Sequence, residues 1–188
     1  MSLPVFAICC WLFLGLEIGL RDALELGQSG VTPSFVVVLL AFVASHAPKT
    51  AALWAGLTLG ALLDLTFDSP DAAGQGAVAV LGPHALGCAA AAYTIVVMRG
   101  SMMRRNPLTL ALLSLVAMAM LTIVATTLLE LRSLWDPSIE VRAAAELWIG
   151  GLRALYSAGL ALPVGGLLAL ATPLFAFQQQ HRVRGWRA

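Results

Sequence analysis

Residues 108–129 read LTLALLSLVAMAMLTIVATTLL and include no Asp, Glu, Lys or Arg. Pro107 precedes this run, at a position where helices often begin. A helix that crosses a membrane needs about 20 mainly apolar residues. We therefore predict a transmembrane helix here, and the same criterion can be applied outward along the chain in both directions.

The whole chain shares this apolar character. Of its 188 residues, 60% are hydrophobic and only 11% are charged, and the mean hydropathy is +0.88. Soluble domains are roughly 45–50% apolar and about 25% charged. A soluble protein of this size could not bury so much apolar surface. The composition predicts an all-α integral membrane protein in the lipid bilayer, and it excludes a soluble enzyme, a nucleic-acid-binding protein and a disordered linker.

Six membrane-spanning helices are predicted in a single transmembrane domain that covers residues 1–188. Their predicted ranges are about 3–20, 35–46, 50–67, 76–98, 107–129 and 147–177. The second is short for a full crossing, and the last is expected to hinge near Gly150-Gly151 or Pro163. Asp136 and Pro137 predict the start of a short outer helix over 137–146.

Charged residues separate across these spans, although the net charge is only +1. Seven basic residues and no acidic residue fall at the two termini and in two of the connections: Lys49, Arg99, Arg104, Arg105, Arg182, Arg184 and Arg187. The opposite side takes the other four basic residues and all ten acidic residues. Because basic loops stay in the cytoplasm, we predict that both termini are cytoplasmic.

One face of the third predicted helix carries small residues and a carboxylate. Ala52, Gly56, Gly60 and Asp64 lie four residues apart. Small residues at this spacing let a neighbouring helix approach closely, so helix packing is the first interpretation of the glycines. Asp64 lies near the outer boundary, and a carboxylate in a span usually has a partner or a water-filled setting. Two interpretations stay open for it: a carboxylate that pairs or caps, or a contact with a partner protein or substrate.

Glu17 raises the same question in the first predicted helix. If the first and third helices touch, Glu17 and Asp64 need a cation between them, which Arg21 or Arg153 could supply. The chain contains no HExxH, GxSxG or P-loop pattern and no paired carboxylates typical of catalysis. We therefore expect no catalytic residue, no metal and no cofactor.

The first and third predicted helices also contain cysteine and tryptophan residues within their apolar runs. Cys9 and Cys10 are adjacent in an apolar run and are either acylated or simply small apolar helix residues. Trp11 and Trp54 lie deep within their spans, so we expect both to pack between helices.

From Pro33 to about Leu131, roughly half its length, the chain resembles the bacterial rod shape-determining protein MreD family. Five features carry this resemblance: Pro33 before the short second helix, the turn at Pro48, the string Gly56-Leu-Thr-Leu-Gly60-Ala-Leu-Leu-Asp64-Leu65, the Gly74/Gly76 turn, and the basic loop that follows the fourth helix. Two loops are longer than the family pattern, at Asp68–Gln75 and Glu130–Glu146.

The resemblance implies a non-enzymatic, multi-pass protein of the bacterial inner membrane that scaffolds peptidoglycan synthesis and cell shape in the cell-elongation complex. Its partners would be an MreC-like protein, the MreB cytoskeleton, a RodA-type glycosyltransferase and a class B penicillin-binding protein. The fold would be similar to the substrate-binding subunits of energy-coupling-factor transporters. Gly56, Gly60 and Asp64 would then shape a helix surface that organises the fold or meets the MreC-like partner.

The alternative function belongs to a different class, a substrate-binding membrane subunit of a small-molecule, vitamin-type uptake transporter. Such a subunit would have an outward-facing pocket lined by polar side chains from several helices. A gene for an MreC- or MreB-like protein next to this one would favour the scaffold, and a vitamin gene would favour uptake.

Overall fold

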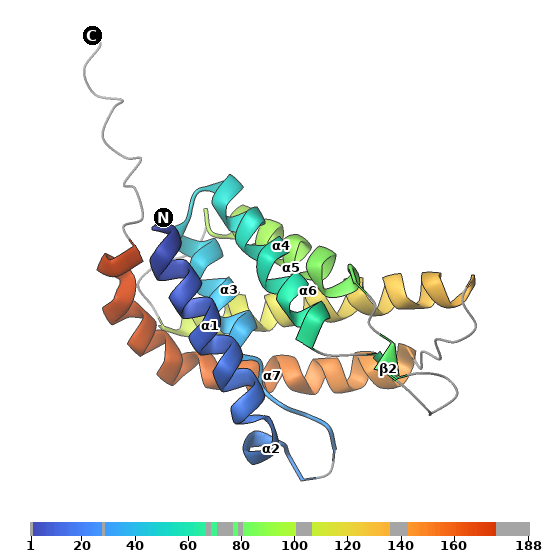
Figure 1. Ribbon diagram of the computed structural model, residues 1–188. Coiled ribbons are helices and arrows are strands. Elements are labelled where there is room, and N and C mark those ends of the chain that lie inside the picture. The colour runs from blue at the N-terminus through green and yellow to red at the C-terminus, as the bar shows by residue number, and fades with distance from the viewer. Residues whose placement is uncertain are drawn as a thin grey trace.

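In the computed structural model, the described residues are 2–27, 29–66, 69–70, 77–78, 81–100, 107–135 and 143–175. They form a bundle of helices, and the predicted all-α class is confirmed for this part of the chain (Figure 1). Two strands of two residues each, β1 (Ser69–Pro70) and β2 (Ala77–Val78), pair in antiparallel fashion, with Ser69 opposite Val78.

The helices in chain order are α1 (Leu3–Gly19), α2 (Arg21–Leu24), α3 (Phe35–His46), α4 (Lys49–Thr66), α5 (Pro83–Met98), α6 (Pro107–Ser133), α7 (Ala143–Ala171) and the short 3-10 helix η1 (Thr172–Phe175). Among the described residues, α6 from Leu108 onward and α7 are long and apolar enough to cross a membrane, by length and composition. By the same measure α1, α3 and α5 are shorter apolar helices.

Two predicted boundaries are wrong. The helix predicted over 76–98 begins only at Pro83, because Gly82 has a φ of 125°, outside the helical region. The predicted last span of 147–177 ends at Ala171 and gives way to η1, where Pro173 lacks the N–H that a longer helix would need.

The start of the last span also differs from the prediction. α7 is one continuous helix from Ala143 through Gly150 and Pro163, so residues 143–146 belong to it. Figure 1 shows its axis bending in the half that contains Pro163, so the expected hinge is a bend within one continuous helix. Several predicted features lie outside the described residues: positions 137–142 of the outer helix, the Gly74/Gly76 turn, the basic loop residues Arg104 and Arg105, and the tail with Arg182, Arg184 and Arg187.

The core of the bundle is α3. Every residue from Phe35 to Ser45 is buried, and α3 packs against α1, α4, α5, α6 and α7. A helix that is hydrophobic on all sides is stable in this way only when other helices surround it. It has 12 residues and is about 18 Å long. Its flanking residues Ser34 and Ala47 are 6% and 1% exposed, so both of its ends lie inside the protein.

Hydrogen bonds gather the helix ends into two groups at opposite ends of the bundle. At the first, which we call the Lys49–Arg99 end, the Ser2 amide donates to the Phe175 carbonyl (3.0 Å) and the Arg99 guanidinium donates to the Ala44 carbonyl (3.0 Å). At the second, the Glu17–Asp64 end, the last turns of α1 and α4 meet the first turns of α3 and α5.

The C-terminus of α3 is held by Arg99, which follows α5. Its Nη1 donates to the carbonyl oxygens of Ala44 and Ala47. These belong to the last carbonyls of a helix, which have no partner within the helix and carry partial negative charge. A guanidinium therefore complements this end both by hydrogen bonding and by charge.

We predict that Arg99→Ala destabilises the protein by about 1.5–3 kcal/mol, the range for hydrogen bonds to a charged group. Arg132→Ala is the matched control, because Arg132 is an exposed arginine in the last turn of α6. Thermal unfolding in detergent, followed by circular dichroism, measures the difference. Equal midpoints for the two variants would contradict this function of Arg99.

Candidate functional site

Asp64 lies in the last turn of α4 and is 1% exposed. It accepts four hydrogen bonds from the start of α5. Its Oδ2 accepts from the backbone N–H of Gly82 (2.8 Å) and Ala85 (3.1 Å). Its Oδ1 accepts from the backbone N–H of His84 (3.0 Å) and lies 2.8 Å from His84 Nδ1. All four contacts are made to residues at the N-terminal end of α5.

The sequence at the start of α5 explains why this carboxylate is needed. Gly82 occupies the N-cap position and has no side chain with which to cap the helix, and Pro83 has no N–H to offer. The remaining free amides in this first turn belong to Gly82, His84 and Ala85, and all three donate to Asp64. Asp64 thus caps α5 from another helix, and its negative charge complements the positive end of the helix dipole.

His84 adds a side-chain contact to this cap. Its ring is 31% exposed, whereas the Asp64 side chain is fully buried. An ionised carboxylate can only accept hydrogen bonds, so the 2.8 Å contact requires the proton on Nδ1 of His84. The carboxylate therefore fixes the tautomer and the orientation of this imidazole.

Gly56 and Gly60 bring α4 close enough for this contact. A Cβ built on Gly56 would lie 2.8 Å from the Cys88 carbonyl oxygen of α5. One built on Gly60 would lie 2.5 Å from the Cα of Ala85 and closer still to the His84 carbonyl oxygen. Because these neighbours are backbone atoms, they cannot move aside without separating the helices. The Gly56–Gly60–Asp64 face, as we call it, is therefore turned toward α5.

Glu17 of α1 caps the start of α3, as Asp64 caps the start of α5. Its Oε2 accepts from the backbone N–H of Phe35 (2.6 Å) and Val36 (3.1 Å). The next amide, of Val37, donates to the side chain of the N-cap residue Ser34 (3.2 Å). The Ser34 amide itself donates to Oγ of the buried Ser157 in α7 (2.9 Å). Every amide at the start of this buried helix thus has a partner.

The two carboxylates do not meet around a shared cation. Each caps a different helix, and α1 packs mainly on α3. Arg153, one of the two predicted cations, donates instead to the Gly30 carbonyl oxygen through Nη2 (2.8 Å) and Nε (3.3 Å). Gly30 lies in the connection before α3, so Arg153 holds that connection against α7.

Sequence reasoning singled out Gly56, Gly60, Asp64 and Glu17 but missed three other residues that hold the ends of α3, Ser34, Ser157 and Arg99. Ser34 could have been found, because serine directly before an apolar helix is a preferred N-cap. Ser157 and Arg99 carry no such local signal, because their partners are more than 50 residues away in the chain.

Within the described part of the chain, each buried side-chain nitrogen and oxygen has a hydrogen-bond partner. The same residues contain no group of three or more His, Cys, Asp and Glu placed to hold a metal ion. The chemistry that the Gly56–Gly60–Asp64 face and Glu17 perform is hydrogen bonding to helix ends, which fixes how four helices meet.

We predict that Asp64→Ala accelerates hydrogen exchange of the amides of residues 82–86, because three of them lose their acceptor. Glu17→Ala should instead accelerate exchange at residues 35–37, which makes the two variants controls for each other. Asp22→Ala, at an exposed carboxylate, should change neither segment. Mass spectrometry of peptides resolves these segments, and unchanged exchange at 82–86 in Asp64→Ala would contradict the cap.

We predict that Gly60→Ala destabilises the protein by about 1–3 kcal/mol or more, because the added methyl group overpacks a backbone contact. Gly159→Ala is the matched control in α7, since nothing lies within 4 Å of a Cβ at that position. Alanine there should leave stability unchanged or raise it slightly through helix propensity. The unfolding midpoint in detergent measures both, and a wild-type midpoint for Gly60→Ala would refute the close approach.

Comparison of the chain with protein-family models, curated proteins and solved structures finds no match.

Proposed function

We propose that this chain is a non-enzymatic, six-span component of the bacterial inner membrane that scaffolds the cell-elongation complex. The observation that carries the proposal is the Gly56–Gly60–Asp64 face, which is the most specific part of the resemblance to the MreD family. In the structure these three residues act together on one neighbouring helix, which supports their treatment as one motif.

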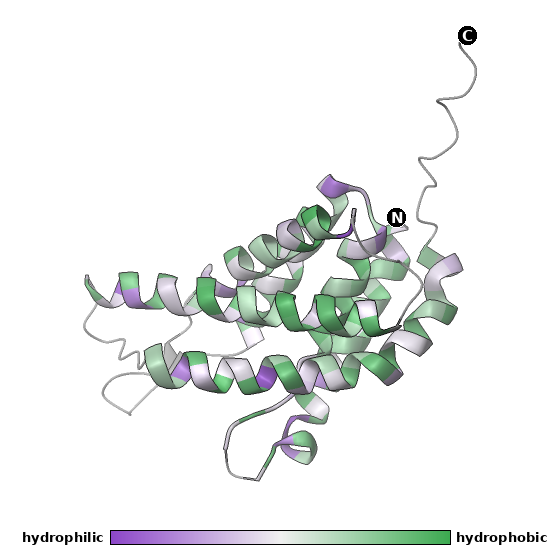
Figure 2. Ribbon diagram, turned by 180° about the vertical axis from the view of Figure 1, so that it is seen from behind, coloured by the Kyte–Doolittle hydropathy of each residue, from purple (hydrophilic) through white to green (hydrophobic). Residues whose placement is uncertain are grey.

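The outer surface of the bundle supports the membrane location. Large apolar side chains are exposed on most helices, among them Trp11 (83%), Trp54 (68%), Leu155 (62%) and Leu167 (69%). Figure 2 shows hydrophobic residues along the whole length of most helices. A soluble monomer rarely exposes so much contiguous apolar surface, whereas a bilayer covers it. We infer that α1, α3, α4, α5, α6 and α7 are the six spans, with α3 enclosed by the others.

The distribution of charge supports the orientation. Lys49 and Arg99 lie at one end of the bundle, and Glu17 and Asp64 lie at the other. Basic residues mark the cytoplasmic side, so the Lys49–Arg99 end faces the cytoplasm in our proposal. The start of α1 and the end of η1 meet at this same end, through the hydrogen bond from Ser2 to Phe175. This arrangement agrees with cytoplasmic termini.

The burial of Asp64 refines how the motif would serve a scaffold. At 1% exposure, Asp64 can touch a partner protein only if α4 and α5 separate. The Gly56–Gly60–Asp64 face would therefore act by fixing the position of α4 against α5. An MreC-like protein would bind surfaces that this pairing holds in place, and the same surfaces would position the MreB cytoskeleton, a RodA-type glycosyltransferase and a class B penicillin-binding protein. We also propose that the fold is similar to substrate-binding subunits of energy-coupling-factor transporters.

The experiment is co-purification of the tagged chain from membranes of its own host. We expect an MreC-like protein to accompany the wild-type chain and Asp22→Asn, and to be lost or reduced with Asp64→Ala. Each variant must first elute as a monodisperse species in detergent, so that loss of partner is separated from loss of fold.

Normal co-purification by a well-folded Asp64→Ala variant would contradict the function we assign to this motif. Recovery of the wild-type chain with a tightly bound vitamin-type molecule, and without elongation proteins, would overturn the scaffold and favour the uptake subunit.

A further inference from the structure

The two longest helices extend further than the rest of the bundle. α6 has 27 residues and α7 has 29, whereas α1 has 17 and α5 has 16. At 1.5 Å per residue, the long pair measures about 40 and 44 Å, compared with about 30 Å of hydrocarbon in a bilayer. Some part of α6 and α7 must therefore either leave the hydrocarbon or cross it at a steep tilt.

Contacts show which part of α6 and α7 extends beyond the bundle. Arg153 of α7 is bound to Gly30 in the connection at the Glu17–Asp64 end. One helical turn earlier, Gly150 packs directly against Thr122 of α6. Residues 123–135 and 143–149 therefore lie beyond this level, and we call them the α6–α7 arm. Figures 1 and 2 show this part of the pair projecting past the other helices.

The exposed surface of the arm combines many large apolar side chains with the charged side chains of Glu130, Arg132 and Glu146. Its exposed large apolar side chains are Ile123 (50%), Leu131 (47%), Leu134 (75%), Trp135 (79%), Leu147 (44%) and Trp148 (72%). Leu131 lies in the last turn of α6, and Leu134 and Trp135 follow in the turn just after the helix. The Trp135 amide donates to the Arg132 carbonyl oxygen there (3.0 Å).

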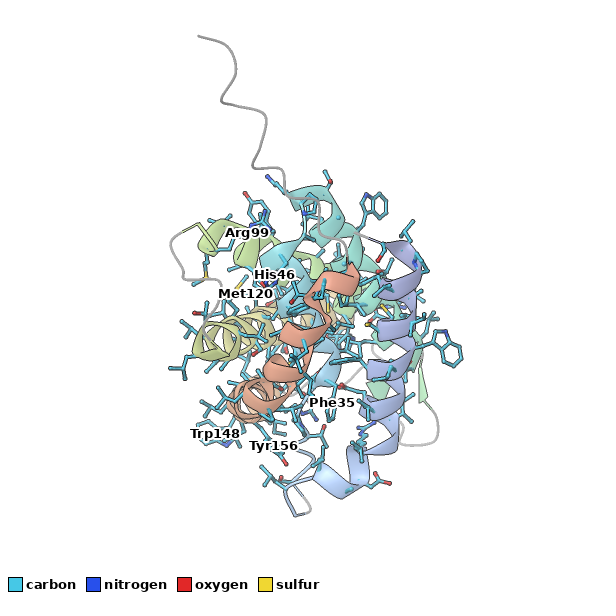
Figure 3. All side chains as sticks on the ribbon, turned by 90° about the vertical axis from the view of Figure 1, so that its left-hand side faces the viewer. Phe35, His46, Arg99, Met120, Trp148 and Tyr156 are labelled. Atoms are coloured by element: carbon cyan, nitrogen blue, oxygen red, sulfur yellow. The ribbon has the colours of Figure 1, made fainter. Side chains whose placement is uncertain are left out.

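The apolar face of α7 in the arm continues into its span. Trp148, Leu152 and Leu155 are spaced i, i+4, i+7 and are all exposed, whereas Glu146 and Arg153 fall on the other side of the helix. Figure 3 shows Trp148 at the periphery of the bundle, with Phe35 of the core on its inner side. The same apolar environment that covers this face in the span must therefore also cover it in the arm.

We propose that the α6–α7 arm lies obliquely in the headgroup layer of the non-cytoplasmic leaflet of the inner membrane, with Trp135 and Trp148 at the interface between lipid and water. This inference rests on the proposed membrane location and orientation. Its partner is the lipid surface, which is the same partner that covers the adjoining spans. Tryptophan prefers this layer because its ring is apolar and its indole N–H is polar. Charged groups such as Glu130 and Arg132 are also accommodated there, unlike in the hydrocarbon.

The direction of the arm favours the lipid surface over a protein in the surrounding water. In Figure 1, α6 and α7 run at a steep angle to α1, so the arm leaves the bundle sideways and not along the axis of α1. An arm in this position would anchor one side of the bundle at the outer interface. It would thereby fix the tilt of the bundle in the bilayer, because interfacial aromatic residues set helix tilt.

Depth-dependent fluorescence quenching tests this position in lipid vesicles. A variant that keeps Trp135 alone is made by replacing Trp11, Trp54, Trp148 and Trp186 with Phe. A matched variant keeps Trp54 alone, as the reference for a side chain on a span. Each is reconstituted in phosphatidylcholine brominated either near the headgroup or near the chain ends, and iodide is added as the aqueous quencher. If the fourfold replacement impairs folding, Trp135→Phe alone gives the same information by difference.

We expect Trp135 to lose more fluorescence to shallow bromines than to deep ones, and to be largely protected from iodide. Trp54 should be quenched by bromolipids and protected from iodide. Strong quenching of Trp135 by iodide, with none by bromolipid, would place the arm in water and overturn the inference. If Trp54 also escaped both bromolipids, the membrane location itself would fail, so the two failures are distinguishable.

Discussion

The free amides at the start of a buried helix need acceptors, and two carboxylates from other helices supply them in this protein. α3 begins inside the bundle and α5 begins where its first turn is partly buried, so the first N–H groups of both helices need acceptors from the protein. Glu17 at the end of α1 and Asp64 at the end of α4 accept these hydrogen bonds. An unpaired amide in such a setting would cost about 1–3 kcal/mol. The positions of four helices thus depend on two acidic side chains.

Glycine completes the arrangement that the carboxylates begin. Asp64 reaches the start of α5 only because α4 and α5 are in backbone contact at Gly56 and Gly60. The C-terminal end of α3 is capped by a residue of opposite charge, since the Arg99 guanidinium donates to its last carbonyls. Acidic caps at one end and a basic cap at the other also agree with the charge separation expected of a protein in a membrane. The same few charges therefore hold the helix ends together and, in our proposal, also set the orientation.

The all-helical class and the bounds of the central helix could be predicted from apolar run length, because residues 35–46 are bounded by polar residues and proline. The spacing of Gly56, Gly60 and Asp64 likewise indicated a packing face, because residues four apart share one side of a helix. The partners could not be predicted. Arg99 binds residues of a helix more than 50 positions earlier, and only the fold brings them together. The prediction that Trp11 and Trp54 pack between helices is wrong, since they are 83% and 68% exposed. Hydropathy does not distinguish side chains that face outward from those that face another helix.

A double-mutant cycle in mixed detergent micelles tests the central claim, that Glu17 and Asp64 are independent structural caps. The free energy of reversible unfolding is measured for the wild type, Glu17→Ala, Asp64→Ala and the double variant. Because the two residues cap different helices, each single variant should lose stability and the losses should add to within about 0.5 kcal/mol. Wild-type stability for either single variant would contradict the account, because that carboxylate would then be serving something other than the fold.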